Sequence, residues 1–340
     1  MSDKVTALPA NVRRYAKYLL IMSGLGGLIY GIDVGVIAAA LPYIRNTADY
    51  STAQLGFIVG AVLWGSVLSS LFAGTLAEWF GRKKIIIASA FCFFISIPVI
   101  CASGLFDGGN FFLLTLGRTL QGASAGLVGV VVPMYLAECL DSDSRGKGTG
   151  MFQLLLTIGL AFAAVIGLVV TGLVGDSDKV INELGKAAVK PEQISSWIKA
   201  WQTIFWCSAV PGLILFLGAF KLKESPRWLY KKGRKDEALA SLAANNGDEK
   251  AREILEEMLA ADAAAVDNRA LNVILMAQQA GGQCHIAHGD LIADHGRTDR
   301  ITIVDDREAD MAFKAIFLAQ HFQQMAIALS FGTKGIIFSA

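Results

Sequence analysis

Long apolar stretches alternate with short polar segments along the first 220 residues of the chain. A helix needs about 20 mostly apolar residues to cross a bilayer, and a window of that length predicts six membrane spans. They lie near residues 18–41, 55–77, 85–105, 112–136, 151–175 and 202–220. A seventh, weaker candidate lies near 312–331, where five polar residues interrupt the apolar run: Lys314, Gln320, His321, Gln323 and Gln324. The pattern therefore predicts an all-α integral membrane protein.

The composition favours the same class. Hydrophobic residues make up 54% of the chain and charged residues only 17%, with a mean hydropathy of +0.50, whereas a soluble domain carries about 25% charged residues. The first span is too long, and too closely followed by others, to be a cleaved signal peptide. Glycines within the spans indicate helices that pack closely. Five cysteines are an odd number, and three lie inside spans, so neither a disulfide framework nor a thiolate metal site is expected.

Lysine and arginine are distributed unevenly between the two sides of the predicted bundle. The segments before span one and after spans two, four and six carry sixteen of them near the membrane, against five in the other loops. Cytoplasmic loops retain the excess of positive charge. We therefore expect both ends of the six-span unit to lie inside, in a plasma membrane, which is the inner membrane if the organism is a bacterium.

Asp33 is the only charged residue of the first span, within Gly31-Ile32-Asp33-Val34-Gly35. A carboxylate at membrane depth costs at least about 2.5 kcal/mol, so such residues usually face a watery cavity or a proton path. The alternative is a structural aspartate that caps a neighbouring helix or pairs with a cation. The position predicts a functional site inside the membrane.

Three segments on the expected cytoplasmic side combine charges with turn residues. The loop after span two runs from Gly74 to Lys84, and Gly81 suits its tight turn. Span four is followed by Pro133-Met134-Tyr135-Leu136-Ala137-Glu138 and then Arg145, and span six by Glu224-Ser225-Pro226-Arg227-Trp228-Leu229. Solvated loop charges would explain any one of these segments. Together they indicate a cytoplasmic network of ion pairs.

On these segments the chain resembles the N-terminal half of a sugar porter of the major facilitator superfamily, over roughly residues 15–245. The family ends its sixth span with the Ser225-Pro226-Arg227-Trp228-Leu229 run, which makes this match the most specific. The loop from Gly74 to Lys84 is similar to the superfamily signature, but Glu78 and Trp79 replace the usual Asp and Arg. Further matches are Gly31 to Ile37, Gly117-Arg118-Thr119-Leu120-Gln121-Gly122, Glu138 with Arg145-Gly146, and Gln153-Leu154-Leu155.

The resemblance implies the six-helix N-terminal bundle of the major facilitator fold, with short cytoplasmic helices and with the C-terminal bundle largely missing. The implied units are a six-span bundle (1–222), a cytoplasmic helical segment (223–262), a polar loop (263–311) and a candidate seventh span (312–340). It also implies transport of a monosaccharide, by proton-coupled symport, as two bundles rock about a central site. The alternatives are a sugar facilitator, a porter for another small solute, and a non-functional fragment.

The resemblance also assigns roles to individual residues. Asp33 matches the family's proton-coupling carboxylate, and Arg118 in span four is its natural partner, because a buried carboxylate needs a cation or a proton. Protonation of Asp33 would release Arg118. Gln153 matches a sugar-binding glutamine, and Tyr30 would supply an aromatic wall or simply pack at the membrane interface. The cytoplasmic gate would consist of Glu78, Arg82, Glu138, Arg145, Glu224 and Arg227.

The last third of the chain fits the family poorly. Gln323 and Gln324 match a double-glutamine motif that binds sugar, but Leu329 stands where the family has an asparagine. Histidines and acids between 263 and 311 match no metal-ligand spacing, and the spans hold no cluster of catalytic groups, so no cofactor, metal or enzyme activity is expected. The expected partners are a sugar, a proton and the bilayer, with no nucleic acid. A missing C-terminal bundle is the expected structural partner, without which the chain would not transport.

Overall fold

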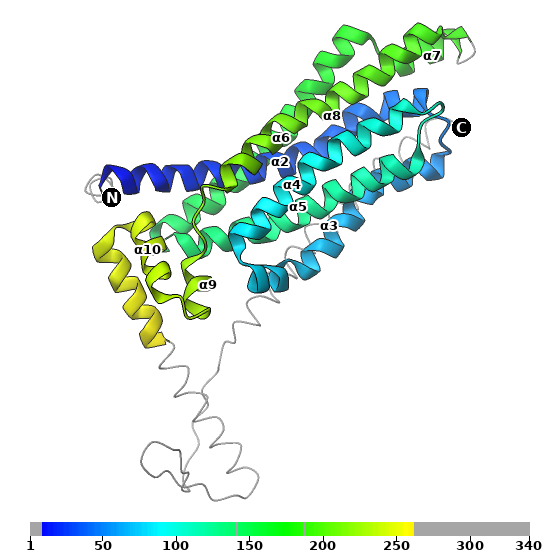
Figure 1. Ribbon diagram of the computed structural model, residues 1–340. Coiled ribbons are helices and arrows are strands. Elements are labelled where there is room, and N and C mark those ends of the chain that lie inside the picture. Colours follow the sequence, from blue (N-terminus) through cyan, green and yellow to red (C-terminus); the bar gives the residue numbers. More distant parts are fainter. Residues whose placement is uncertain (1–8, 141, 186–187, 262–340) are drawn as a thin grey trace, which may run out of the picture.

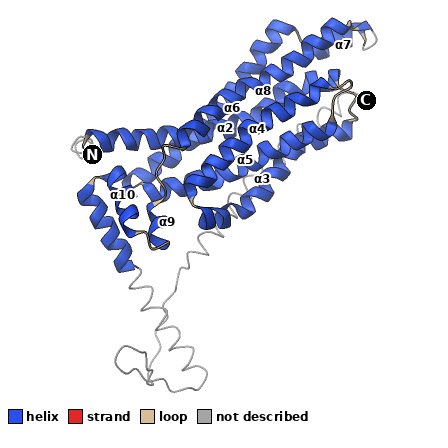
Figure 2. Ribbon diagram, viewed as in Figure 1, coloured by secondary structure: helices blue, strands red, loops and turns tan. Residues whose placement is uncertain are grey.

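A computed structural model describes residues 9–140, 142–185 and 188–261 (Figure 1). These residues form helices joined by short loops, and no strand occurs among them (Figure 2). Six of the helices are long and apolar enough to cross a membrane, which confirms the predicted spans. They are α2 (Ala10–Thr47), α3 (Thr52–Phe80), α4 (Arg82–Ala102), α5 (Phe111–Cys139), α6 (Ser142–Val174) and α8 (Pro191–Ala219).

The helices extend beyond the apolar stretches that predicted them. The segment between spans five and six, expected to be a loop, contains the short helix α7 (Ser177–Leu184) and the first turns of α8. The Asp176 carboxylate caps α7 by accepting from two backbone N–H groups of its first turn, and Pro191 opens α8. Both are strong helix-start signals. Hydropathy marks only the part of a helix that lies in hydrocarbon, so the polar ends escaped the prediction.

Two helix pairs form the sides of the bundle: α2 packs most extensively against α6, and α5 against α3, while α4 and α8 connect the two pairs. Glycines allow these close approaches, as predicted. A Cβ on Gly31 would lie 1.9 Å from the Leu156 carbonyl oxygen of α6, and one on Gly122 would lie 2.0 Å from the Val62 carbonyl oxygen of α3. Where backbones come this close in lipid, only a residue without a side chain fits.

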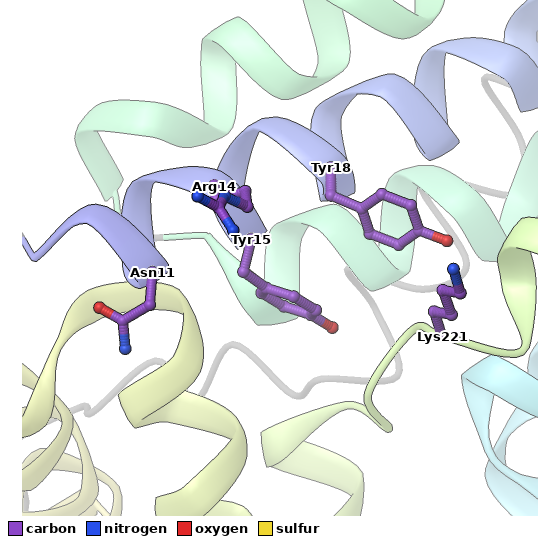
Figure 3. Close-up of a pocket in the computed structure, with 5 residues that line it drawn as sticks. All are labelled: Asn11, Arg14, Tyr15, Tyr18 and Lys221. Carbon is purple, nitrogen blue, oxygen red and sulfur yellow. The ribbon is translucent and has the colours of Figure 1, made fainter.

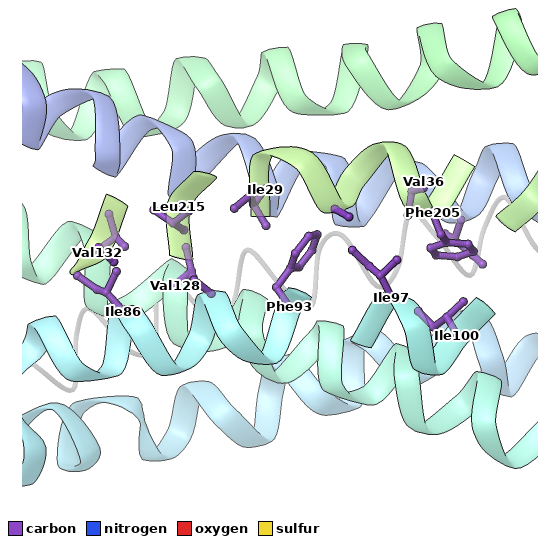
Figure 4. Close-up of a cluster of buried hydrophobic side chains, with 14 of the residues drawn as sticks. Ile29, Val36, Ile86, Phe93, Ile97, Ile100, Val128, Val132, Phe205 and Leu215 are labelled. Atoms are coloured by element: carbon purple, nitrogen blue, oxygen red, sulfur yellow. The ribbon is translucent and has the colours of Figure 1, made fainter. Parts of the chain in front are cut away.

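A buried apolar core runs along the bundle between these helices (Figure 4). Large side chains of α4 and α8, such as Phe93, Ile97 and Phe205, meet Val128 of α5 and Val36 of α2, and each of these side chains is almost fully buried. The outer faces of α3 and α6 instead expose large apolar side chains. Such faces suit a hydrocarbon environment better than water.

Short helices cover one end of the bundle, next to the start of α2 (Figure 1). They are α9 (Pro226–Lys231) and α10 (Lys235–Asn246), and a further helical stretch covers 248–261. Ser225 caps α9 through the backbone N–H of Trp228, with Pro226 in the first turn. We call this the α9 end and the opposite one the α7 end. The predicted 263–311 loop and the candidate seventh span lie outside the described residues.

Candidate functional site

Asp33 of α2 and Arg118 of α5 form an ion pair inside the bundle, with 3.4 Å between Arg118 Nη1 and Asp33 Oδ1. Their side chains are 0% and 1% exposed. The register of α2 explains this placement. Gly31 and Gly35 face α6, and each residue of an α-helix turns by about 100°, so Asp33, midway between them, points to the opposite side and reaches α5.

A third polar residue, Gln121, completes this site. Arg118 Nη1 donates to Gln121 Oε1 over 2.7 Å, and the guanidinium carbon lies 5.8 Å from the centre of the Phe205 ring. Gln121 was not predicted as a site residue. Its spacing of three residues from Arg118, which puts both on one helix face, could have revealed it.

Several polar atoms of this site have no hydrogen-bond partner within the described part of the chain. They are Asp33 Oδ2, Arg118 Nε and Gln121 Nε2. Buried polar atoms nearly always have hydrogen-bond partners in folded proteins, so three buried atoms without a described partner in one cluster need an explanation. The cluster holds one acid, one cation and one amide, and a single proton can change its net charge from zero to +1.

Of the two predicted sugar ligands that the structure describes, Tyr30 lies near this pair and Gln153 lies on another helix, α6. Tyr30 is buried on α2, close enough to Asp33 to interact electrostatically. Gln153 is exposed on α6, and its carbonyl oxygen accepts from the Thr157 hydroxyl one turn later. Gln323 and Gln324 lie outside the described residues.

A second charged cluster, at the α9 end, joins segments that are far apart in the sequence. Arg82 at the start of α4 pairs with Glu138 at the end of α5, with 2.7 Å between Nη2 and Oε1. The other Glu138 oxygen accepts from the Ser225 hydroxyl. Glu224 Oε1 accepts from the backbone N–H groups of Lys83 and Ser225, at 3.0 and 2.9 Å. We call these residues, Arg82, Glu138, Glu224 and Ser225, the α9-end cluster.

Gly81 forms the turn between α3 and α4, as predicted, and it is required there for two reasons. Its φ is 97°, which side-chain-bearing residues rarely adopt. A Cβ at this position would also lie 2.3 Å from Glu224 Oε2. The turn therefore lets the Glu224 carboxylate reach the backbone of α4.

Three predicted gate residues do not join the α9-end cluster. Glu78 contributes only its backbone carbonyl, which accepts from Trp228 Nε1 over 2.8 Å. Arg145 Nε donates to the Leu140 carbonyl oxygen over 3.2 Å. The side chains of Glu78, Arg145 and Arg227 are exposed, and none forms an ion pair with a described residue.

An ion pair at the α7 end was not predicted. Arg45 Nη2 lies 2.6 Å from Asp178 Oδ2, and Asn46 Nδ2 donates to the other oxygen of Asp178 over 2.7 Å. These contacts attach α7 to the end of α2. Arg45 and Asp178 are partly exposed, with 55% and 33% of their side-chain surfaces accessible.

A shallow hollow of about 350 Å³ lies at the α9 end, between the start of α2 and the end of α8 (Figure 3). Arg14, Tyr15 and Tyr18 line it from α2, together with Asn11 and Lys221. The Tyr18 hydroxyl donates to the Gly218 carbonyl, and the Tyr15 hydroxyl accepts from the Lys223 N–H. Neither Tyr30 nor Gln153, the predicted sugar ligands that the structure describes, lines the hollow.

The chain matches the family described as "Sugar (and other) transporter" over residues 19–283. A D-xylose transporter from Levilactobacillus brevis is 31% identical over 221 residues, which are 65% of this chain and 42% of that protein. The arabinose-proton symporter of Escherichia coli (strain K12) is 28% identical over 249 residues, 73% of this chain and 46% of that protein. The chain spans about half the length of the curated relatives that it matches.

Solved structures resemble the fold. The xylose transporter XylE from E. coli, in a partially occluded inward-open conformation, aligns with a TM-score of 0.63 at 21% identity, over 77% of this chain and 61% of that one. The proton:xylose symporter XylE bound to 6-bromo-6-deoxy-D-glucose aligns with a TM-score of 0.61 at 22% identity, over 72% and 53%. These likenesses confirm the predicted six-helix bundle of the major facilitator fold.

Proposed function

The chain belongs to the sugar (and other) transporter family, and from this membership we propose that it forms the N-terminal bundle of a proton-coupled monosaccharide symporter. The family consists of transporters, so the prediction that the chain is not an enzyme is confirmed. The names of two relatives, a D-xylose transporter and an arabinose-proton symporter, support a sugar and a proton as the transported species. The observation that carries the proposal is the fully buried pair of Asp33 and Arg118.

In this mechanism Asp33 is the proton carrier. With Asp33 ionised, the charges of Asp33 and Arg118 cancel, and the attraction holds α2 against α5. A proton on Asp33 Oδ2, which has no partner within the described residues, removes that attraction and leaves a net charge of +1. The conformations of a transporter differ in how well they tolerate this change. Proton binding therefore shifts the population towards one of them.

The α9-end cluster serves as the cytoplasmic gate in this proposal. The excess of Lys and Arg at this end supports its placement on the cytoplasmic side of a plasma membrane. The cluster ties the turn between α3 and α4 to the end of α5 and to the segment just before α9, so it holds this end of the bundle together while the bundle rocks. On this proposal, residues 1–222 form the transmembrane unit and 223–262 a cytoplasmic helical segment. A C-terminal bundle, corresponding to the half of the relatives that this chain does not match, would complete the transporter.

Gln153 is the proposed sugar ligand, because its exposed amide offers both donors and acceptors to hydroxyl groups. Losing one such hydrogen bond costs about 0.5–1.5 kcal/mol, so Gln153→Ala should weaken sugar binding by up to about tenfold. Thr157→Ala, one turn away and also exposed, is the matched control. Equal affinities of the Gln153→Ala variant and the unaltered transporter in a binding titration would remove this residue from the sugar site.

A facilitator is the competing function, and Asp33 separates it from a symporter. In proteoliposomes containing the complete transporter, Asp33→Asn should abolish sugar accumulation driven by a pH gradient and leave sugar exchange at equal concentrations largely intact. Asp107→Asn, which alters an exposed acid, should change neither. Undiminished uphill uptake by the Asp33→Asn variant would contradict proton coupling through this residue.

A further inference from the structure

We propose that Gln121 is the positioning residue that holds Arg118 while Asp33 carries a proton. This inference rests on the proposed proton coupling and adds a third member to it, which neither the motif comparison nor the family match assigns. With Asp33 as its only partner, Arg118 would be stabilised while Asp33 is ionised but not while Asp33 is protonated. Gln121 gives Arg118 a partner when Asp33 is protonated.

The distances show that Arg118 is already shared between two acceptors. Its Nη1 lies 2.7 Å from Gln121 Oε1 and 3.4 Å from Asp33 Oδ1. The first distance is at the short end for N–H···O hydrogen bonds and the second is beyond their usual range. The guanidinium is therefore bound to the amide first, and the carboxylate is held by a longer, more easily broken contact.

A neutral acceptor lowers the energetic cost of burying the Arg118 cation after proton binding has removed the charge of Asp33. When Asp33 becomes neutral, Arg118 is left as a buried cation, which is strongly unfavourable without other partners. An amide oxygen accepts the same N–H group whatever the charge on Asp33. The Phe205 ring, 5.8 Å from the guanidinium carbon, adds an attraction that is equally independent of the proton. Arg118 thus remains bound in both states.

A purely structural role explains Gln121 poorly. The residue is fully buried, and its Nε2 has no hydrogen-bond partner in the described part of the chain. A buried amide with an unsatisfied donor destabilises a core that an apolar side chain of similar size would fill better. Among the described residues, the contact that accounts for the amide is its hydrogen bond to Arg118.

Among the described residues packed around Asp33 and Arg118, none offers Arg118 a second charged partner. Within the described residues, the ionisable groups that act on Asp33 are Arg118 of α5 and Tyr30 of α2. Helix α8 presents the Phe205 ring, and α6 approaches α2 with the backbone of Leu156. Helix α4 approaches α5 with the side chain of Ile100, beside Gly117. No second described acid contacts Arg118 to take over the cation.

The test follows the protonation of Asp33 directly, in the 340-residue chain embedded in lipid nanodiscs. The carbonyl stretching band of a protonated carboxyl group is recorded by infrared spectroscopy with ¹³C-labelled aspartate, and the Asp33→Asn variant identifies the contribution of Asp33. The measured quantity is the pH at which half of this band has disappeared. It is compared between the unaltered chain, Gln121→Met and Gln121→Glu.

The two variants should shift this midpoint in opposite directions. In Gln121→Met, Arg118 depends on Asp33 alone, so the proton leaves more easily and the midpoint falls by about one pH unit. In Gln121→Glu, a second carboxylate binds Arg118 and repels a charge on Asp33, so the midpoint rises by a similar amount. A residue that only fills space would not produce opposite shifts.

Unchanged midpoints, or shifts of both variants in one direction, would overturn the role of Gln121 while leaving proton binding by Asp33 intact. If Gln121→Met does not fold, Gln121→Glu decides alone, and a midpoint that fails to rise overturns the inference. A chain in which Asp33 shows no protonated band at any pH refutes the proposed function itself, and this inference with it.

Discussion

Two ion pairs of the described bundle, one largely and one fully buried, are built from the same kinds of side chain but differ in how many hydrogen bonds their carboxylates accept. In the α9-end cluster, Arg82 and Glu138 lie 2.7 Å apart, and the second oxygen of Glu138 accepts from the Ser225 hydroxyl. In the core pair, Arg118 and Asp33 lie 3.4 Å apart, and the second oxygen of Asp33 has no described partner. The carboxylate of the more deeply buried pair thus has fewer described hydrogen-bond partners.

This difference distinguishes the α9-end cluster, which keeps one geometry, from the core pair, which can change when Asp33 binds a proton. A carboxylate that accepts hydrogen bonds on both oxygens is held in one geometry. A carboxylate that is fully desolvated and contacts its cation over a long distance is easier to neutralise, and its partner already has another acceptor. The α9-end cluster is therefore suited to holding segments together, and the core pair to binding and releasing a proton.

Neutralising each acid in turn tests the difference between the two ion pairs. Glu138→Gln leaves Arg82 almost buried without its counter-charge and should lower the free energy of unfolding by about 3 kcal/mol. Asp33→Asn should cost less than about 1 kcal/mol, because Gln121 and Phe205 still hold Arg118. The measurement is a reversible denaturant titration of the chain in mixed micelles. A larger loss for Asp33→Asn than for Glu138→Gln would reverse the roles that we assign to the two pairs.

A smaller loss of stability is expected from a substitution in the turn beside the α9-end cluster. Gly81→Ala forces a side chain into a conformation with φ of 97°, which costs about 1–3 kcal/mol. It also places Cβ against the Glu224 carboxylate, which must move and lose its contacts to the backbone. Gly175→Ala is the control, since Gly175 has a φ of 91° and no atom near its Cβ position.

The difference between these two glycine variants, measured in the same titration, isolates the contribution of Glu224. We expect Gly81→Ala to be the more destabilising of the two. Equal losses would mean that the Glu224 carboxylate moves freely and does not stabilise the turn.

The exposed pair at the α7 end should matter least. Arg45→Ala removes an ion pair whose arginine is 55% exposed, and exposed pairs contribute about 0–1 kcal/mol. The loss should shrink further in high salt because the charges are screened. A loss comparable with that of Glu138→Gln would show that burial is the wrong measure for ranking these contacts.

The sequence predicted the large features because each depends on local pattern or on a motif. Long apolar runs predicted the six spans, and a turn between two of them predicted the role of Gly81. The resemblance to sugar porters pointed to Asp33, Arg118 and Glu138, and the structure brings Asp33 to Arg118 and Glu138 to Arg82.

What escaped prediction depends on where side chains meet after the helices have packed. Gln121 matters because Arg118 turns towards it. The spacing of three residues puts both on one helix face, but it does not say which neighbour the guanidinium contacts. The contact between Arg45 and Asp178 exists only because α7 folds back onto α2. Conversely, Arg145 and Arg227 match motif positions, but their side chains lie outside the described cluster.

Sugar affinity measured against pH in the complete transporter tests whether Asp33 couples proton binding to sugar binding. Coupling between two ligands is reciprocal, so the dissociation constant for sugar should rise as pH increases and Asp33 loses its proton. In the Asp33→Asn variant the dissociation constant should be independent of pH over the same range. An Asp33→Asn variant that retains the pH dependence of the unaltered transporter would show that Asp33 does not couple the two ligands.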